Sequence, residues 1–168
     1  MSFVISAGEP PDAPGLSPEA QSAVWFLGAL VTIRIGGTHS GGSLAILDHT
    51  AERGYHSPRH VHSRDEETFF VLDGELRLEI DDQTLSAGPG VAVVLPRARP
   101  HAFVVTSPAA RFLTLHTPAG FEGLVRRAGT PAASLSLPPV DLLATDPVEL
   151  AALAAHYEVE ITGPPPSP

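Results

Sequence analysis

Cysteine and lysine are both missing from this chain of 168 residues. Without cysteine the protein cannot form a disulfide, a thiolate zinc site or an iron–sulfur cluster, and it has no cysteine nucleophile. Any metal ion must therefore be held by histidine and carboxylate side chains, which suit divalent transition metals.

Positive charge is also scarce. Ten arginines stand against 19 acidic residues, which gives a formal net charge of −9. A protein that binds nucleic acid needs a clustered basic face to neutralise phosphates, and we find no helix-turn-helix pattern in the sequence. The sequence therefore argues against a nucleic-acid partner.

Long apolar runs are absent as well. Nowhere do 18 apolar residues follow one another, so no membrane span is predicted. The first residues, MSFVISAGEPPDAPG, have no basic flank, and their apolar stretch is too short for a secretory signal. The sequence predicts a soluble cytoplasmic protein that does not bind membranes.

Proline and glycine are abundant, with 18 and 15 residues, well above their usual combined share of roughly 12 per cent. This composition favours short strands and turns over long helices. Eight β-type runs separated by turn residues follow one another through the middle of the chain: 23–35, 43–49, 67–74, 75–80, 83–88, 90–96, 101–107 and 111–117. Their spacing predicts an antiparallel sandwich or small barrel.

The chain divides into four predicted segments: an extended N-terminal arm (1–20), a β-barrel (21–118), a helical extension packed on the barrel (119–160) and a proline-rich tail (161–168). Within the extension, residues 120–129 read as a short helix with Gly129 as its C-cap. Residues 146–157 read as a second helix, because Asp146 can cap it and Pro147 suits the first helical position.

The stretch 54–75, GYHSPRHVHSRDEETFFVLDGE, concentrates the groups that can do chemistry. His60 and His62 are two residues apart, so on a strand both imidazoles leave from the same face. Glu67 has the wrong parity for that face, but the polar SRD turn between them can reset the register. His101, at the head of a later strand, would supply a third imidazole.

Three imidazoles and one carboxylate suit one divalent transition metal ion and leave positions open for water, dioxygen or a substrate oxygen. Iron, manganese, cobalt, nickel, copper and zinc would all accept this set. Alternation along the strands predicts an apolar substrate pocket lined by inward residues: Phe69, Val71, Leu76, Leu78, Phe103 and Val105.

Other polar residues show no comparable spacing. The remaining histidines read as loop, surface or ordinary core residues: His39, His49, His56, His116 and His156. Arg97 and Arg99 flank His101 and read either as rim groups that steer a phenolate or as plain surface arginines. Phe70 and Leu72 are apolar but face away from Glu67, which predicts that another sheet or a second subunit covers them.

The same residues carry a resemblance to the cupin family. Five positions match the first cupin motif, G-x5-H-x-H-x4-E-x6-G: Gly54, His60, His62, Glu67 and Gly74. Three match the second motif, G-x5-P-x-G-x2-H-x3-N: Gly90, Pro96 and His101. Two positions of the second motif depart from the family pattern: Ala98 in place of glycine and Val105 in place of asparagine.

This resemblance implies an all-β cupin fold, a double-stranded β-helix or jelly-roll barrel, here with an N-terminal arm and short C-terminal helices. It also implies that His60, His62, Glu67 and His101 bind the metal. At finer grain the sequence is similar to single-domain bacterial cupins related to quercetin 2,3-dioxygenase. In these enzymes dioxygen opens the ring of a metal-bound flavonol with loss of carbon monoxide.

The finer resemblance implies that Glu67 is both a ligand and the general base, within hydrogen-bond reach of the substrate hydroxyl. It further implies a small aromatic substrate and O2 as the second substrate. We also expect the protein to be a homodimer. Two alternatives stay open: a metal-dependent non-oxidative cupin, such as an isomerase, and a cupin that binds a small molecule without catalysis.

Overall fold

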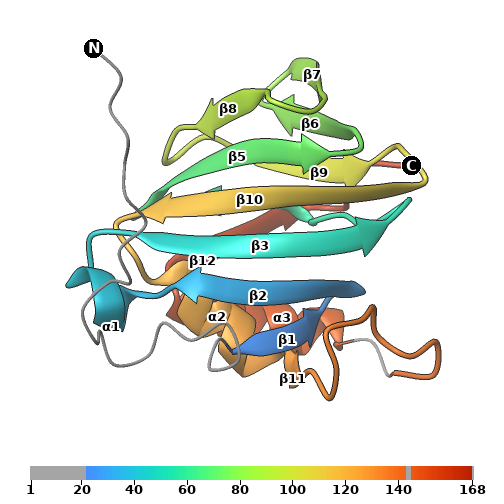
Figure 1. Cartoon of the computed structure of the whole chain (residues 1–168). Coiled ribbons are helices and arrows are strands. Elements are labelled where there is room, and N and C mark those ends of the chain that lie inside the picture. Colours follow the sequence, from blue (N-terminus) through green and yellow to red (C-terminus); the bar gives the residue numbers. More distant parts are fainter. Residues whose placement is uncertain (1–21, 143–144, 168) are drawn as a thin grey trace, which may run out of the picture.

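The computed structural model describes residues 22–142 and 145–167, and it is built mainly from two antiparallel sheets (Figure 1). One sheet has seven strands, in the order β11 (Thr130–Pro131), β1 (Ala23–Phe26), β2 (Ala29–Ile35), β3 (Ala45–Glu52), β10 (Ala109–Thr117), β5 (Glu66–Asp73) and β8 (Ala92–Leu95). The other has five, in the order β12 (Val159–Gly163), β4 (Arg59–His62), β9 (His101–Val105), β6 (Leu76–Ile80) and β7 (Gln83–Ala87). This is the predicted all-β, jelly-roll class of fold.

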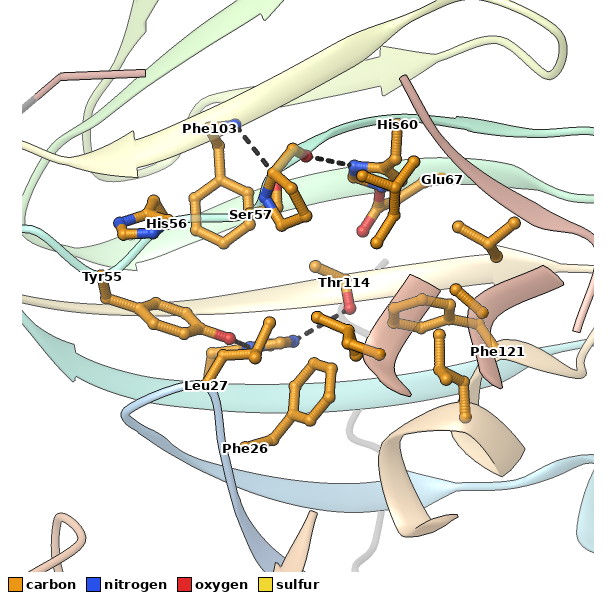
Figure 2. A pocket seen from close by; sticks show the side chains of 17 residues that line it. Phe26, Leu27, Tyr55, His56, Ser57, His60, Glu67, Phe103, Thr114 and Phe121 are labelled. Carbon is orange, nitrogen blue, oxygen red and sulfur yellow. Dashed lines mark hydrogen bonds between the residues drawn. The ribbon is translucent and has the colours of Figure 1, made fainter. Parts of the chain in front are cut away.

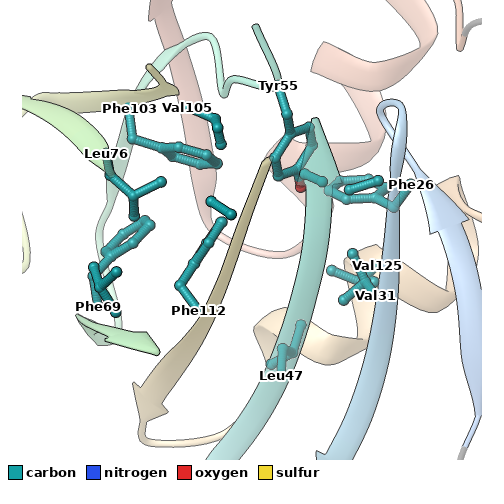
Figure 3. Close-up of a cluster of buried hydrophobic side chains, with 14 of the residues drawn as sticks. Phe26, Val31, Leu47, Tyr55, Phe69, Leu76, Phe103, Val105, Phe112 and Val125 are labelled. Carbon is teal, nitrogen blue, oxygen red and sulfur yellow. The ribbon is translucent and has the colours of Figure 1, made fainter. Parts of the chain in front are cut away.

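Alternating apolar residues build the core between the sheets (Figure 3). On β6, Leu76 and Leu78 are fully buried, whereas the intervening Arg77 is half-buried. Phe69 and Phe112 come from neighbouring strands, and their rings stack with centroids 5.6 Å apart. Full burial of each such apolar side chain contributes about 1.5–3 kcal/mol to the free energy of unfolding.

The first predicted strand, 23–35, is wrong as a single element, because the chain reverses at Leu27 and Gly28 to form the β1–β2 hairpin. Both turn residues have positive φ, +52° and +97°. This is the geometry of a two-residue hairpin turn whose twist matches the strands it joins. Because Leu27 is apolar, the sequence showed no sign of a turn at this position. Leu27 also lines the pocket described below.

The stretch 54–75 crosses from one sheet to the other. β4 belongs to the five-stranded sheet and β5 to the seven-stranded sheet, with residues 63–65 between them. Parity along one strand therefore does not decide where Glu67 points, since Glu67 faces His60 and His62 from the opposite sheet. The polar SRD turn therefore brings Glu67 to the side of His60 and His62, as the sequence predicted.

Within residues 22–142 and 145–167, three helices accompany the sheets: α1 (Gly37–Ser40), α2 (Phe121–Ala128) and α3 (Pro147–His156). The two predicted helices are confirmed as α2 and α3. The Asp146 carboxylate accepts hydrogen bonds from the backbone N–H groups of Val148 and Glu149, at 2.9 and 3.0 Å. Gly129 follows α2 in an extended conformation, with φ −83° and ψ 159°, so it ends the helix without a left-handed turn. Among the described residues, no helix combines the length and apolarity that a membrane crossing requires.

The end of the chain differs from the sequence-based division. Residues 159–163 were assigned to the helical extension and the tail, but they form β12, which pairs with β4 in the second sheet. Val159 lies opposite His62, and Ile161 lies opposite His60. The partner strand lies about a hundred residues earlier, so no local pattern could reveal the pairing. The predicted arm, 1–20, lies outside the described residues.

Candidate metal centre

The structure brings together the four predicted ligands. His60 and His62 leave from β4, Glu67 from β5 and His101 from the start of β9, and all four are buried. One ligand atom from each lies within 4.8 Å of the others. The register explains this convergence, because His60 and His101 lie directly opposite each other on paired strands.

Backbone carbonyls fix two of the imidazoles in the form that binds a metal. Nδ1 of His60 lies 2.8 Å from the Pro58 carbonyl oxygen, and Nδ1 of His101 lies 2.8 Å from the Arg99 carbonyl oxygen. A carbonyl oxygen can only accept, so each Nδ1 carries the proton and donates it. The lone pair of each ring is therefore on Nε2, which faces the centre of the cluster.

A buried carboxylate fixes the third imidazole in the same way. Asp65 accepts from Nδ1 of His62 at 3.1 Å and from Nδ1 of His116 at 2.7 Å. Burial by itself would raise the pKa of Asp65, but the hydrogen bonds from His116 and His62 outweigh it and hold that pKa well below its usual range. The ionised carboxylate keeps Nε2 of His62 turned toward the cluster.

The distances between the ligand atoms fit a shared cation. Nε2 of His60 and Nε2 of His62 are 3.1 Å apart, and Glu67 Oε2 lies 3.2 Å from Nε2 of His101. Ligand atoms bound at about 2.1 Å and at right angles to each other are about 3.0 Å apart. Two lone pairs facing each other at this distance repel unless a cation lies between them.

The charge state of the set also fits a divalent metal. Burial, together with the neighbouring imidazoles of His101 and His62, lowers the pKa of His60 to about 3, so the ring is neutral at physiological pH. Burial works to raise the pKa of Glu67, but without a metal ion the imidazole of His101, 3.2 Å away, and the other nearby rings outweigh it and lower that pKa. A divalent cation held by neutral imidazoles and this one carboxylate keeps a single positive charge, which favours an anionic substrate oxygen.

A buried hydrogen-bonded chain, which the sequence reading missed, runs away from the centre. His116 Nε2 lies 3.2 Å from the Thr114 hydroxyl, which lies 3.1 Å from His49 Nε2. Nδ1 of His49 lies 3.3 Å from the Tyr55 hydroxyl. The sequence does not distinguish His49 and His116 from ordinary loop, surface or core histidines, although alternation on the predicted strand 111–117 places Thr114 and His116 on one face. Asp65 lies in a turn and gave no such signal.

A pocket opens beside His60 and Glu67 (Figure 2). The β1–β2 hairpin, α2, α3 and β12 supply most of its apolar wall: Phe26, Leu27, Phe121, Leu124, Leu150, Ala154, Val159 and Ile161. Tyr55, Pro58 and Phe103 add to this wall. Besides the ligands, polar groups on His49, His56, Ser57 and Thr114 and the hydroxyl of Tyr55 face the pocket.

The predicted pocket residues are placed differently from the prediction. Phe103 lines the pocket, but the other five lie in the core between the sheets: Phe69, Val71, Leu76, Leu78 and Val105. Alternation identified their inward face correctly, yet it carries no information about depth along the barrel. The pocket lies at the end that the hairpin and the helices cover.

Polar residues near the motif in sequence lie on the surface in the structure. Arg97 pairs with Glu66 at 3.5 Å, and Arg99 pairs with Asp81. Both arginine side chains are more than half exposed. These contacts favour the reading of Arg97 and Arg99 as surface arginines. His39 and His156 are exposed, as expected for surface histidines.

Changing Asp65 to asparagine is expected to weaken metal binding about 10- to 100-fold, since groups that orient a ligand imidazole contribute about this much to affinity. The amide cannot accept from His62 and His116 as a carboxylate does. Competition with a chromophoric chelator measures the change. Asp82→Asn, at an exposed turn position, is the control. An unchanged affinity in Asp65→Asn would show that Asp65 does not orient His62.

Two facing antiparallel sheets with a buried three-histidine, one-glutamate cluster define a cupin-type barrel whose centre could hold a metal ion. Residues 48–116 match the family model described as Cupin domain, and this span contains all four candidate ligands. This stretch of the chain is therefore similar to cupin domains. No curated protein matches the chain significantly in sequence.

Solved structures agree with this fold. An RmlC-like cupin from Shewanella frigidimarina is 16% identical, with a TM-score of 0.55 over 64% of this chain and 92% of that one. KdgF from Halomonas sp. is 23% identical, with a TM-score of 0.50 over 54% and 79%. A predicted oxalate decarboxylase from Thermotoga maritima is 13% identical, with a TM-score of 0.51 over 54% and 80%. At these identities the likeness shows the fold alone.

Proposed function

We propose that this protein is a metal-dependent dioxygenase that cleaves a flavonol or related aromatic enol with O2. The observation that carries the proposal is the junction of two environments in one pocket. Lone pairs of neutral imidazoles and an ionised carboxylate converge at His60 and Glu67, and the remaining wall is largely apolar and aromatic. A flat substrate with an acidic hydroxyl at one end matches that junction.

His60, His62, Glu67 and His101 would hold the metal. A divalent transition metal there would act as a Lewis acid toward the enol oxygen and provide open positions for dioxygen. The chain's own part is to keep water out of the site and to take up the hydroxyl proton.

Glu67 is the group placed to accept that proton, because it lines the pocket and is ionised. The hydroxyl of an enol next to a carbonyl is more acidic than that of a simple alcohol, so it gives up its proton to a carboxylate more readily than a sugar hydroxyl does.

The proposal is tested by oxygen consumption. Metal-free protein is loaded with one of the six candidate metals at a time, quercetin is added without air, and O2 is then admitted. Oxygen uptake with release of carbon monoxide in equal amount is expected for at least one metal. Chelator-treated protein is the control. No uptake with any flavonol on fully metallated protein would contradict the proposal.

A metal-dependent non-oxidative cupin is the second candidate. The polar side of the pocket favours it, because His49, Thr114 and Ser57 face the cavity and could bind a keto or hydroxyl group. Such an enzyme would convert its substrate without oxygen uptake. A cupin that only binds its ligand would neither take up oxygen nor form a product, so oxygen uptake measured together with product formation separates the three functions.

We further propose that the protein is a homodimer. Phe70 and Leu72 on β5 and Val94 on β8 are 36%, 37% and 56% exposed on adjacent strands of the seven-stranded sheet. Their position on the outer face of that sheet supports a second copy as the cover, since contiguous exposed apolar side chains mark association sites.

Light scattering after size exclusion is expected to give twice the monomer mass. Val94→Arg should shift the protein to the monomer, because it would bury a charge in the interface. Val148→Arg, at an exposed apolar position on α3, should leave the mass unchanged. A monomeric wild type at micromolar concentration would contradict the dimer.

A further inference from the structure

The wall of the pocket farther from the metal ligands carries a tyrosine that the proposed reaction leaves unused. Tyr55 lies between β3 and β4, and its side chain reaches into the pocket from the end away from His60 and Glu67 (Figure 2). Phe121 lies on the side of the metal ligands, where its ring centroid is 5.1 Å from that of His62, and Leu27 also lines the pocket (Figure 2). The pocket thus has a polar group at each end, and His49 and Thr114 also face it.

The Tyr55 ring is held firmly in place. It packs edge-on against Phe103 with ring centroids 5.4 Å apart, and Phe112 lies 6.4 Å away. The backbone is fixed as well, since Tyr55 donates to the Glu52 carbonyl at 3.1 Å and accepts from the Val105 N–H at 2.8 Å. The position of the hydroxyl is therefore set before any ligand enters.

A neutral partner holds the Tyr55 hydroxyl. His49 contacts it at 3.3 Å and is itself fixed by Thr114 and by stacking on Phe112, with ring centroids 4.7 Å apart. Burial lowers the pKa of His49 to about 4, so its ring is uncharged at neutral pH. Burial, with a smaller contribution from Glu67, raises the pKa of Tyr55 above its usual value, so the phenol keeps its proton.

A tyrosine hydroxyl can both donate one hydrogen bond and accept others. Among the described residues, the hydroxyl of Tyr55 has one hydrogen-bond partner, His49. One partner leaves further hydrogen-bonding capacity for a ligand in the pocket. A ligand that displaces water there without replacing its hydrogen bond leaves a buried polar group unpaired, which a site of this kind penalises.

We infer that Tyr55, held by His49, is the second polar anchor of the pocket and selects aromatic substrates that carry a hydroxyl group remote from the enol. This inference rests on the proposed function, which places the enol at Glu67. It adds a specificity-determining residue that takes no part in the chemistry. The substrate class becomes a polyhydroxylated aromatic enol, as opposed to one whose far end is bare hydrocarbon.

The test compares two probes in anaerobic absorbance titrations of the full chain loaded with metal. Quercetin carries remote hydroxyls, whereas 3-hydroxyflavone has the enol alone. The wild type is expected to bind quercetin about fivefold more tightly, the effect of one neutral hydrogen bond. Tyr55→Phe should bind both probes alike. The matched control is Tyr157→Phe, which changes the chain's other tyrosine, half-buried after α3, and should keep the preference.

Each result has a distinct meaning. Equal binding of the two probes by the wild type, or a preference kept in Tyr55→Phe, would overturn the inference and leave the dioxygenase proposal intact. Binding of neither probe by the metallated wild type would overturn the substrate class and the inference together. The melting temperature of Tyr55→Phe shows whether the fold is preserved, and the wild-type preference tests the inference without any variant.

Discussion

Glu67→Gln is expected to lower flavonol turnover about 10²- to 10⁴-fold, the usual contribution of a general base. The amide has nearly the same shape as the carboxylate but cannot take up the hydroxyl proton. Oxygen uptake at saturating substrate is the measurement, with rates expressed per bound metal ion. This normalisation matters because the loss of one negative charge at a buried site also weakens cation binding.

Glu66→Gln is the matched control for this experiment. Glu66 is the adjacent residue on β5, yet it lies outside the site and pairs with the exposed Arg97. The same chemical change at this position should leave turnover and metal content unaltered. If Glu67→Gln retained the wild-type rate with a full complement of metal, Glu67 would not be the base, and the proton acceptor would have to be sought elsewhere in the pocket.

His101→Ala is expected to abolish stable metal binding. The variant removes one of three nitrogen ligands and also the imidazole that contacts Glu67 at 3.2 Å. In the wild type, metal at one hundred times its dissociation constant should add about 2.7 kcal/mol to the free energy of unfolding. Most of this increment should be missing in the variant. Thermal melts with and without metal, combined with elemental analysis, measure both effects.

His156→Ala is the control for the ligand variant, because His156 is exposed on α3. It should bind metal and respond to it as the wild type does. The metal-free forms must be compared first, since truncation of a buried side chain leaves a cavity that destabilises the protein by itself. Stoichiometric metal in His101→Ala would show that the other three residues suffice or that the metal binds elsewhere.

The sequence predicted the ligands far better than their surroundings. His60 and His62 could be paired from a spacing of two, because alternation is a local property of any strand. Glu67 needed the cupin resemblance, since the chain crosses between sheets before reaching it. The five misplaced pocket residues share a different cause, because position along the barrel depends on which elements cover each end.

The buried polar network around His49 and His116 could not be predicted either, because it depends on contacts between distant strands. His49 lies on β3 and His116 on β10, and Thr114 links them because these two strands pair. Each is one histidine on an alternating strand, and a single sequence does not show that Thr114 joins them. The Leu27–Gly28 turn was not predicted for a local reason, because leucine rarely adopts the positive φ that Leu27 has here.

The span that matches the family model, 48–116, ends before β12, yet β12 pairs with the ligand strand β4. Every residue of β4 pairs with β12, whereas His60 is the residue of β4 that pairs with β9. A fragment cloned to the limits of the matched span, 48–116, would retain all four ligands. It would nevertheless leave the ligand strand as a sheet edge and remove much of the pocket wall. The smallest unit worth expressing thus extends through β12, and an affinity tag is better fused away from that strand.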